Sequence, residues 1–298
     1  ALIIALLLAL IMPAAIPTPT GFTFRVPTAE AAITGNLISK VYVDKARYNP
    51  GNTAVITVEC LNKTGTSWSG SLALTITHNE ATTYTASQSV TLSPNVPATF
   101  TFNWTTPATD YQGYHVEVRA GTSDYSASAI DVSSNWTRFP RYGYMTEYPT
   151  GESAATSTAN MQELARNYHI NAIQFYDWMW RHEKLIKRTG GTIDTSWTDW
   201  SGKTINWQTL QNQISAAHTL NMSAMAYDII YGALDNYQSI SGVDPQWALY
   251  NDTTHTNQWN FNFGDAFPTT HMYMFNPANS NWQSYISGQF NDALNNGF

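Results

Sequence analysis

Apolar and polar residues alternate in short runs over roughly residues 36–135. Alternation places the apolar side chains of each run on one face of a β-strand. The runs are Val41/Val43, Ala54/Ile56/Val58/Cys60, Leu72/Leu74/Ile76, Val90/Leu92, Phe100/Phe102/Trp104, Tyr114/Val116/Val118 and Ile130/Val132. Turn residues such as Asn49–Asn52 and Asn62–Gly65 separate the runs. Seven short strands with regular turns predict an immunoglobulin-like β-sandwich, in which Cys60 is a small buried hydrophobe.

The hydrophobic period changes after Trp136, where short apolar segments alternate with helical patterns. The predicted strands are Tyr142–Met145, Ala172–Tyr176 and Ser223–Tyr227. The predicted helices carry Met161/Leu164/Ala165/Tyr168, Leu210/Ile214/Ala217 and Trp282/Tyr285/Ile286/Gln289/Ala293. We expect Ser157 or Thr158 to cap the first helix and Ser280-x-x-Gln283 to form a capping box at the third. Strand–helix alternation of this kind predicts βαβ units and a parallel sheet.

The links that follow the predicted strands are long and rich in aromatic residues, at 177–206 and 228–279. In a (β/α)8 TIM barrel, the loops at the carboxyl ends of the strands build the active site. Such a barrel needs about 250 residues, and only about 160 follow Trp136, so we expect the barrel to be truncated as it enters its fourth strand. The predicted domains are a signal peptide at 1–31, an immunoglobulin-like β-sandwich at 32–135 and the first part of the barrel at 136–298.

The first residues indicate export. Ala1–Met12 is apolar and uncharged, and Ala29-Glu30-Ala31 is a small-residue cleavage site, so cleavage would leave Ala32 first. We therefore expect a secreted protein with no membrane attachment after cleavage. A lipid-anchored or retained segment is the alternative.

Composition narrows the possible partners. Charged residues make up 12% of the chain and aromatic residues 13%, and the formal net charge is −7. This balance argues against a nucleic-acid partner. A surface rich in rings, hydroxyls and amides suits a neutral, polyhydroxylated ligand, although a secreted β-rich protein without a special ligand has the same composition. The single cysteine excludes a disulfide framework within the chain.

A Tyr-Asp pair stands at the end of two predicted strands, Tyr176-Asp177 and Tyr227-Asp228. A carboxylate at the mouth of a barrel can accept hydrogen bonds from two hydroxyls of one sugar ring. The alternative for Asp177 is a helix cap paired with Arg181, and the alternative for Asp228 is the cap of a short helix. Repetition of the pair at two strand ends favours a binding site.

Further candidates flank these pairs. Trp178 and Trp180 offer flat apolar faces to a sugar or pack against the barrel, and Glu147 follows the first strand. His182-Glu183 lacks the second histidine of a metalloprotease signature, so we expect no metal. The sequence contains no Gly-x-Ser-x-Gly elbow, phosphate loop or dinucleotide fingerprint, and we expect no cofactor.

At several of these positions the chain resembles glycoside hydrolase family 66, which holds endo-dextranases and cycloisomaltooligosaccharide glucanotransferases. The matching stretches are Val41–Gly51, Pro140–Tyr144, Gln174–Lys184, Lys187–Gly191 and Ala224–Tyr227. The resemblance runs from about residue 38 to the end of the chain, and its details are closest to the glucanotransferase branch.

The resemblance implies an enzyme acting on dextran, an α-1,6-linked glucan, through a carboxylate nucleophile and a carboxylic acid/base with retention. It implies that both groups lie beyond Phe298, so this stretch alone would hold no catalytic residue. The family's substrate-site residues carry over to Tyr176, Asp177 and Tyr227. At 228 the family often has Asn, and the Asp in this chain adds a charge near the site.

The main expectation is a cyclising glucanotransferase that makes cyclic isomaltooligosaccharides and is a monomer when full length. The first alternative is an endo-dextranase that hydrolyses α-1,6 linkages. The second, from another class, is a non-catalytic glucan-binding protein. Products formed from dextran discriminate among the three.

Overall fold

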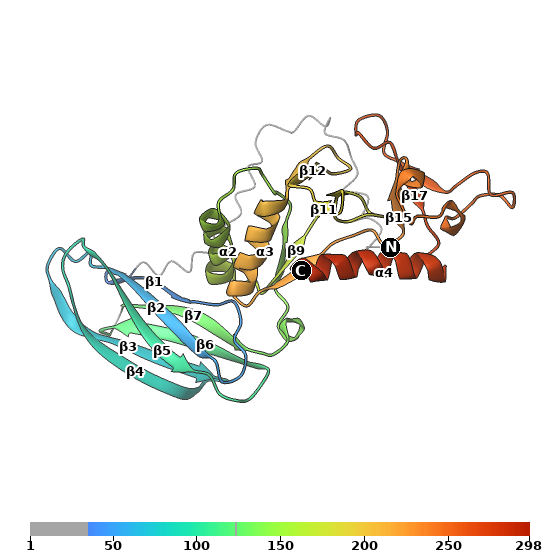
Figure 1. Cartoon of the computed structure of the whole chain (residues 1–298). Coiled ribbons are helices and arrows are strands. Elements are labelled where there is room, and N and C mark those ends of the chain that lie inside the picture. Colours follow the sequence, from blue (N-terminus) through green and yellow to red (C-terminus); the bar gives the residue numbers. More distant parts are fainter. Residues whose placement is uncertain (1–34, 123) are drawn as a thin grey trace, which may run out of the picture. The chain divides into compact units, whose positions relative to one another are not determined.

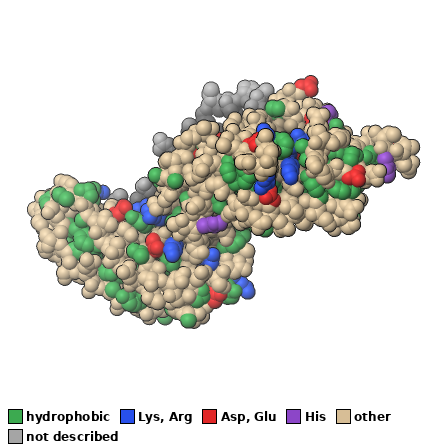
Figure 2. All heavy atoms as spheres, viewed as in Figure 1, with side chains coloured by type: hydrophobic (Ala, Val, Ile, Leu, Met, Phe, Trp, Pro, Cys, Tyr) green, Lys and Arg blue, Asp and Glu red, His purple; other side chains and the backbone are tan. Residues whose placement is uncertain are grey.

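The computed structural model describes residues 35–122 and 124–298, and these residues are mostly β-sheet (Figure 1). The predicted signal peptide at 1–31 lies outside the described residues. No helix in the described ranges is long and apolar enough to cross a membrane. Most of the face in Figure 2 is tan, the colour of backbone and uncharged polar side chains, in keeping with the low charged fraction of the sequence.

The first region is a sandwich of two antiparallel sheets. One sheet has the order β1-β2-β5 and the other the order β4-β3-β6-β7. The strands are β1 Ile38–Val43, β2 Thr53–Leu61, β3 Trp68–His78, β4 Ala81–Leu92, β5 Pro97–Thr105, β6 Gln112–Ala120 and β7 Asp124–Val132. Every alternating run of the sequence lies in one of these strands. Each sheet has one apolar face, and the two apolar faces pack against each other to form the core.

The sandwich core joins side chains of both sheets. Ile56 on β2 and Leu74 on β3 are 0% and 1% exposed, and Cys60 is buried as expected. Complete burial of an aliphatic side chain contributes about 1.5–3 kcal/mol. The alternation read from the sequence therefore predicts the core directly.

The second region begins with a parallel sheet of order β14-β9-β8, where β8 is Tyr142–Met145, β9 is Ala172–Phe175 and β14 is Ser223–Ala226. Helices α2 (Ala154–Tyr168) and α3 (Trp207–Thr219) connect these strands and lie side by side (Figure 1). Ile173 and Phe175 are fully buried in the cluster that includes these helices. The opposite face carries the alternate residues, among them Tyr144 and Gln174, which are paired across β8 and β9. The sheet is open within the described residues, so no closed barrel is observed there.

Two helix caps differ from the expectation. Ser153, and not Ser157 or Thr158, caps α2, and its hydroxyl accepts a hydrogen bond from the Thr156 amide at 3.1 Å. Ser157 is buried one turn later and its hydroxyl donates to Glu152. Any of these hydroxyls can cap a helix, so packing of the helix decided which one does.

Helix α4 (Ser280–Asn295) also begins without the expected capping box. The Asn279 side chain accepts from the amides of Asn281 and Trp282. The Gln283 side-chain amide donates to the Pro277 carbonyl at 2.8 Å and does not bond to Ser280. Asparagine is as strong a cap as serine, and here it stands one residue earlier.

The long links contain short strands that alternation did not predict. The first link holds two hairpins, β10 Arg188–Thr189 with β11 Thr192–Ile193 and β12 Ser196–Thr198 with β13 Thr204–Asn206. The second forms an antiparallel sheet of order β15-β17-β16, from β15 Gly232–Leu234, β16 Asn260–Asn262 and β17 His271–Met274. Short 3-10 helices lie at Trp136–Arg138, Tyr237–Ser239 and Pro245–Trp247. Strands this short are below the length at which a period of two can be recognised.

Candidate carbohydrate-binding site

The two Tyr-Asp pairs lie side by side at the carboxyl ends of β9 and β14. Strand β9 pairs with β14 in parallel, with Phe175 opposite Ala226. The Tyr227 amide continues this ladder by donating to the Phe175 carbonyl at 3.2 Å. The parallel register therefore brings together two residue pairs that are about fifty positions apart in the sequence.

The tyrosine rings of the two pairs stack. The ring centroids of Tyr176 and Tyr227 are 4.1 Å apart with an interplanar angle of 29°, and Tyr144 meets Tyr176 edge-on at 6.3 Å. Burial raises the pKa of Tyr227, and hydrogen bonding to the Tyr176 hydroxyl raises it further. The Tyr227 hydroxyl thus stays protonated, and the pair combines apolar ring surface with hydroxyl groups that can donate and accept hydrogen bonds.

Asp177 is half-buried next to this pair and adopts a left-handed backbone conformation, with φ of 47°. Aspartate tolerates this region better than most residues. Burial raises the pKa of Asp177, while a hydrogen bond with the Trp200 side chain and the charge of His182 act in the opposite direction. The ionised carboxylate can accept hydrogen bonds from hydroxyls, and the protonated form can also donate one.

Asp228 lies differently. Its side chain is 0% exposed, and its Oδ1 is 2.7 Å from Nδ1 of the buried His182. Burial raises the pKa of Asp228, while the hydrogen bond from His182 lowers it. The Oδ2 atom is buried without a hydrogen-bond partner among the described residues. In this arrangement Asp228 joins the link after β9 to the link after β14 and does not open to solvent.

The charged run after Trp180 is part of the same buried structure. Arg181 pairs with Glu183, whose side chain is 0% exposed, and not with Asp177. Glu183 Oε2 accepts from the Leu234 amide at 3.1 Å, and Arg181 donates to the Asp235 carbonyl at 2.6 Å. Burial raises the pKa of Glu183, against the effect of the Arg181 charge. These hydrogen bonds connect the link that follows β9 with strand β15 and the residue after it.

The remaining candidates occupy different environments. Trp178 is 0% exposed, and its indole N–H donates to the Tyr227 carbonyl at 3.1 Å, so it stabilises the backbone of the site and does not face solvent. Trp180 is half-buried, with the Lys187 ammonium 5.7 Å from its ring centroid. Glu147 is exposed, and its backbone carbonyl accepts from the Gln213 side chain. The structure brings Tyr176, Asp177 and Tyr227 together.

Sequence patterns missed a further aromatic group next to Asp177. The ring of Trp200 stacks on Phe263 with 4.8 Å between centroids and lies 5.2 Å from the ring of Phe267. These contacts connect the link after β9 with the link after β14. The only available signal was the aromatic richness of these links, because their residues follow no helical or strand period. Over the described ranges, no group of three or more His, Cys, Asp and Glu side chains is arranged to hold a metal ion.

Aromatic rings and a carboxylate are thus gathered at the ends of adjacent parallel strands, as in the loops that bind ligands in α/β folds. The model of glycosyl hydrolase family 66 matches residues 43–298, and the chain belongs to this family.

Individual relatives agree with this assignment. Two cycloisomaltooligosaccharide glucanotransferases from Niallia circulans are 51% and 47% identical to the chain over 90% of its length. A dextranase from Streptococcus salivarius is 24% identical over 56% of the chain. The chain spans 27%, 28% and 21% of these relatives, respectively.

A solved structure is also similar. The cycloisomaltooligosaccharide glucanotransferase of a Paenibacillus species, crystallised with cycloisomaltoheptaose, superposes with a TM-score of 0.83 and 48% sequence identity. The match covers 87% of this chain and 37% of that one.

Proposed function

We propose that the whole protein is a retaining transglycosylase that acts on α-1,6-glucan and forms cyclic isomaltooligosaccharides. The observation that carries this proposal is the stacked Tyr176–Tyr227 pair with Asp177 beside it, at the ends of adjacent parallel strands. The identity to two cycloisomaltooligosaccharide glucanotransferases supports it over nine-tenths of the chain.

In this proposal the tyrosine pair packs against a glucosyl ring, and Asp177 accepts hydrogen bonds from its hydroxyls. Trp180 and Glu147 contact neighbouring glucosyl units. Asp228 acts from its buried position, where it orients the link that carries Tyr227. A neutral ligand suits the site, because ring packing and hydroxyl recognition need no opposite charge.

The chemical step would use a pair of carboxyl groups, about 5–5.5 Å apart in retaining enzymes. One carboxylate attacks the anomeric carbon and forms a glycosyl–enzyme bond, while the other protonates the departing oxygen. The far end of the same glucan then attacks the intermediate in place of water, which closes the ring. We expect both groups after Phe298 in the whole protein.

The finer architecture is proposed on the same grounds. We propose that the β-sandwich, within 32–135, is immunoglobulin-like and that 136–298 is the first part of a (β/α)8 barrel. The further strands of the barrel would cover the face of the parallel sheet that carries Tyr144 and Gln174. We also propose secretion after removal of residues 1–31, with the whole protein a monomer.

Product analysis tests the proposal. Purified whole protein is incubated with dextran, and the products are separated by mass spectrometry and chromatography. Cyclic products, which lack a reducing end and weigh 18 mass units less than linear ones, support the cyclising transferase. Linear products would instead identify an endo-dextranase, which the similarity to a streptococcal dextranase favours. Binding of dextran without formation of any product would identify a non-catalytic glucan-binding protein.

A further inference from the structure

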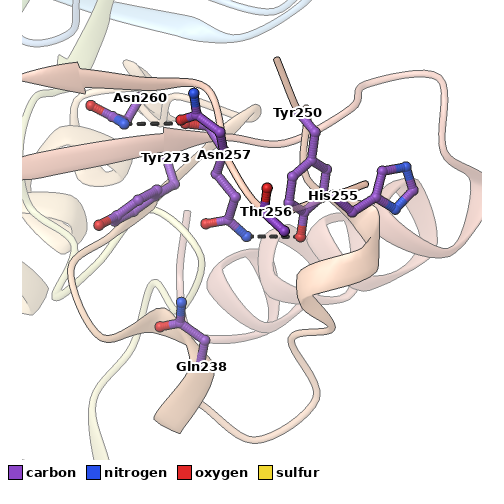
Figure 3. A pocket seen from close by; sticks show the side chains of 8 residues that line it. Gln238, Tyr250, His255, Thr256, Asn257, Asn260 and Tyr273 are labelled. Atoms are coloured by element: carbon purple, nitrogen blue, oxygen red, sulfur yellow. Dashed lines mark hydrogen bonds between the residues drawn. The ribbon is translucent and has the colours of Figure 1, made fainter. Parts of the chain in front are cut away.

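A polar hollow of about 390 Å3 lies in the link after β14, on residues outside the Tyr-Asp site (Figure 3). Its walls include the rings of Tyr250 and Tyr273 and the amide side chains of Asn257, Gln258 and Asn260. Asn257 and Asn260 are exposed, and the tyrosines are half-buried. The volume falls within the range of about 300–1,000 Å3 that small-molecule sites occupy.

The floor of the hollow is built by the β15–β17 sheet. Asn260 on β16 is paired with Tyr273 on β17, so both side chains leave the same face of the sheet. The fully buried Tyr237 lies 5.5 Å from Tyr273, ring centroid to ring centroid, and packs on Phe275 at 5.1 Å. The ring of Tyr273 is therefore held in place before any ligand arrives.

One wall is fixed by hydrogen bonds. The Gln258 side-chain amide donates to the Tyr250 hydroxyl at 3.0 Å (Figure 3). This hydroxyl in turn donates to the Pro245 carbonyl at 2.8 Å. The imidazole of His255 stacks on the Tyr250 ring at 4.7 Å with an interplanar angle of 17°. These contacts set the orientation of both the ring and the amide.

The turn that presents Asn257 is organised by a carboxylate. Asp252 accepts hydrogen bonds from the backbone amides of Thr254, Thr256 and Asn257, at 2.9, 3.1 and 2.7 Å. Hydrogen bonding, the largest contribution being from the Thr254 hydroxyl, holds the pKa of Asp252 well below its usual range. Its negative charge is directed into the turn and not into the hollow, which Asp252 does not line.

The chemistry of the walls favours a neutral ligand, since His255 is their one basic side chain among the described residues and its ring stacks on Tyr250. No Asp, Glu, Lys or Arg is among the described residues that line the hollow. Carboxamides donate and accept hydrogen bonds, as a pair of neighbouring sugar hydroxyls also does, and the tyrosine rings offer faces to C–H groups. We propose that this hollow is a second carbohydrate subsite, which binds a glucosyl unit of the glucan chain apart from the Tyr176–Tyr227 site. The identity of its ligand rests on the proposed function.

Variants in the whole protein test the subsite. The double variant Asn257→Ala/Asn260→Ala removes two exposed amides from the wall. We expect the dissociation constant for dextran, measured by affinity electrophoresis, to rise about 3- to 10-fold, the loss typical of one or two neutral hydrogen bonds. The kcat on a short isomaltooligosaccharide is expected to stay unchanged, because the amides lie outside the Tyr-Asp site. The matched control is Asn103→Ala/Asn291→Ala, which removes two exposed amides elsewhere on the described surface.

The outcomes separate the two proposals. If wild type, variant and control all bind dextran equally, the subsite is refuted and the proposed function stands. If the wild type neither binds nor converts dextran, the proposed function fails and the ligand assigned here fails with it. A variant that loses kcat on the short substrate, at an unchanged melting temperature, would overturn the separation of the hollow from the catalytic site.

Discussion

The β-sandwich and the α/β region satisfy their buried carboxylates in different ways. In the sandwich, the two oxygens of Asp124 accept hydrogen bonds from the Leu37 and Ile38 amides at 2.9 and 3.1 Å. In the α/β region, Asp228 pairs with His182 through one oxygen, and its other oxygen has no partner in the described part of the chain. A carboxylate with both oxygens hydrogen-bonded to backbone amides stabilises its fold, whereas a buried oxygen without a partner costs stability and is typical of functional regions.

Three carboxyl groups of the α/β region share one direction of pKa shift. Burial raises the pKa of Asp177, Glu183 and Asp228, all of which lie in the links that follow β9 and β14. The sandwich is organised around its apolar core. The links after the parallel strands of the α/β region instead hold carboxyl groups whose burial lowers the stability of the fold. This difference predicts that substitutions in the sandwich change stability and that substitutions at the strand ends change glucan turnover.

The largest effect is expected in the sandwich core. Leu74→Ala removes a fully buried side chain and should lower the free energy of unfolding by about 2–5 kcal/mol, with an unchanged KM for dextran. Urea unfolding of the whole protein measures the loss. Leu294→Ala, at an α4 position that is 57% exposed, is the matched control and should cost less than about 0.5 kcal/mol. A loss at Leu74 no larger than the control would contradict the core assignment.

Asp177→Asn should lower kcat/KM on dextran about 100-fold, because charge-assisted hydrogen bonds to substrate hydroxyls each contribute about 1.5–3 kcal/mol. The substitution preserves shape and removes a charge that burial disfavours, so the melting temperature should not fall. Asp124→Asn in the sandwich should do the reverse, lowering the melting temperature at constant kcat/KM. Equal kinetic losses in both variants would remove the distinction between the two regions.

Tyr227→Phe removes a hydroxyl and keeps the stacked ring. We expect KM for dextran to rise about 2- to 10-fold, the contribution of one neutral hydrogen bond. Tyr168→Phe, at a tyrosine on α2 that is 50% exposed, provides the control and should leave KM unchanged. Steady-state kinetics on the whole protein decides, and an unaltered KM in Tyr227→Phe would limit the role of that residue to its ring.

The smallest effect concerns pH. Because burial raises the pKa of Asp228 above its ordinary 3.8, the folded state binds more protons than the unfolded state between pH 3.8 and the raised value. The free energy of unfolding therefore falls as pH rises through this window, by at most about 1.4 kcal/mol per pH unit for one group. Asp228→Asn should reduce this fall, as measured by unfolding at successive pH values. Parallel pH profiles for variant and wild type would show that Asp228 does not titrate abnormally.

Much of the fold was predictable from local patterns. The alternating runs became β1 to β7, and the apolar segments at Tyr142, Ala172 and Ser223 became the parallel strands. Both depend on periodicity, which a residue shares with its near neighbours. The caps at Ser153 and Asn279 were not predicted, because several adjacent residues had the same capping ability. The short strands within the long links were missed for lack of length.

The sequence by itself determined the longer strands and helices, the sandwich core and the presence of a Tyr-Asp pair after each of two strands. Only the tertiary structure decided which side chains of these pairs meet at the site and which is buried elsewhere. Tyr176 and Tyr227 stack and Asp177 stays half-buried, while Asp228 turns to the buried His182. Local sequence sets backbone conformation and the face on which a side chain starts. The direction in which a charged group after a strand finally points depends on partners far along the chain, since desolvation and pairing energies arise only after packing.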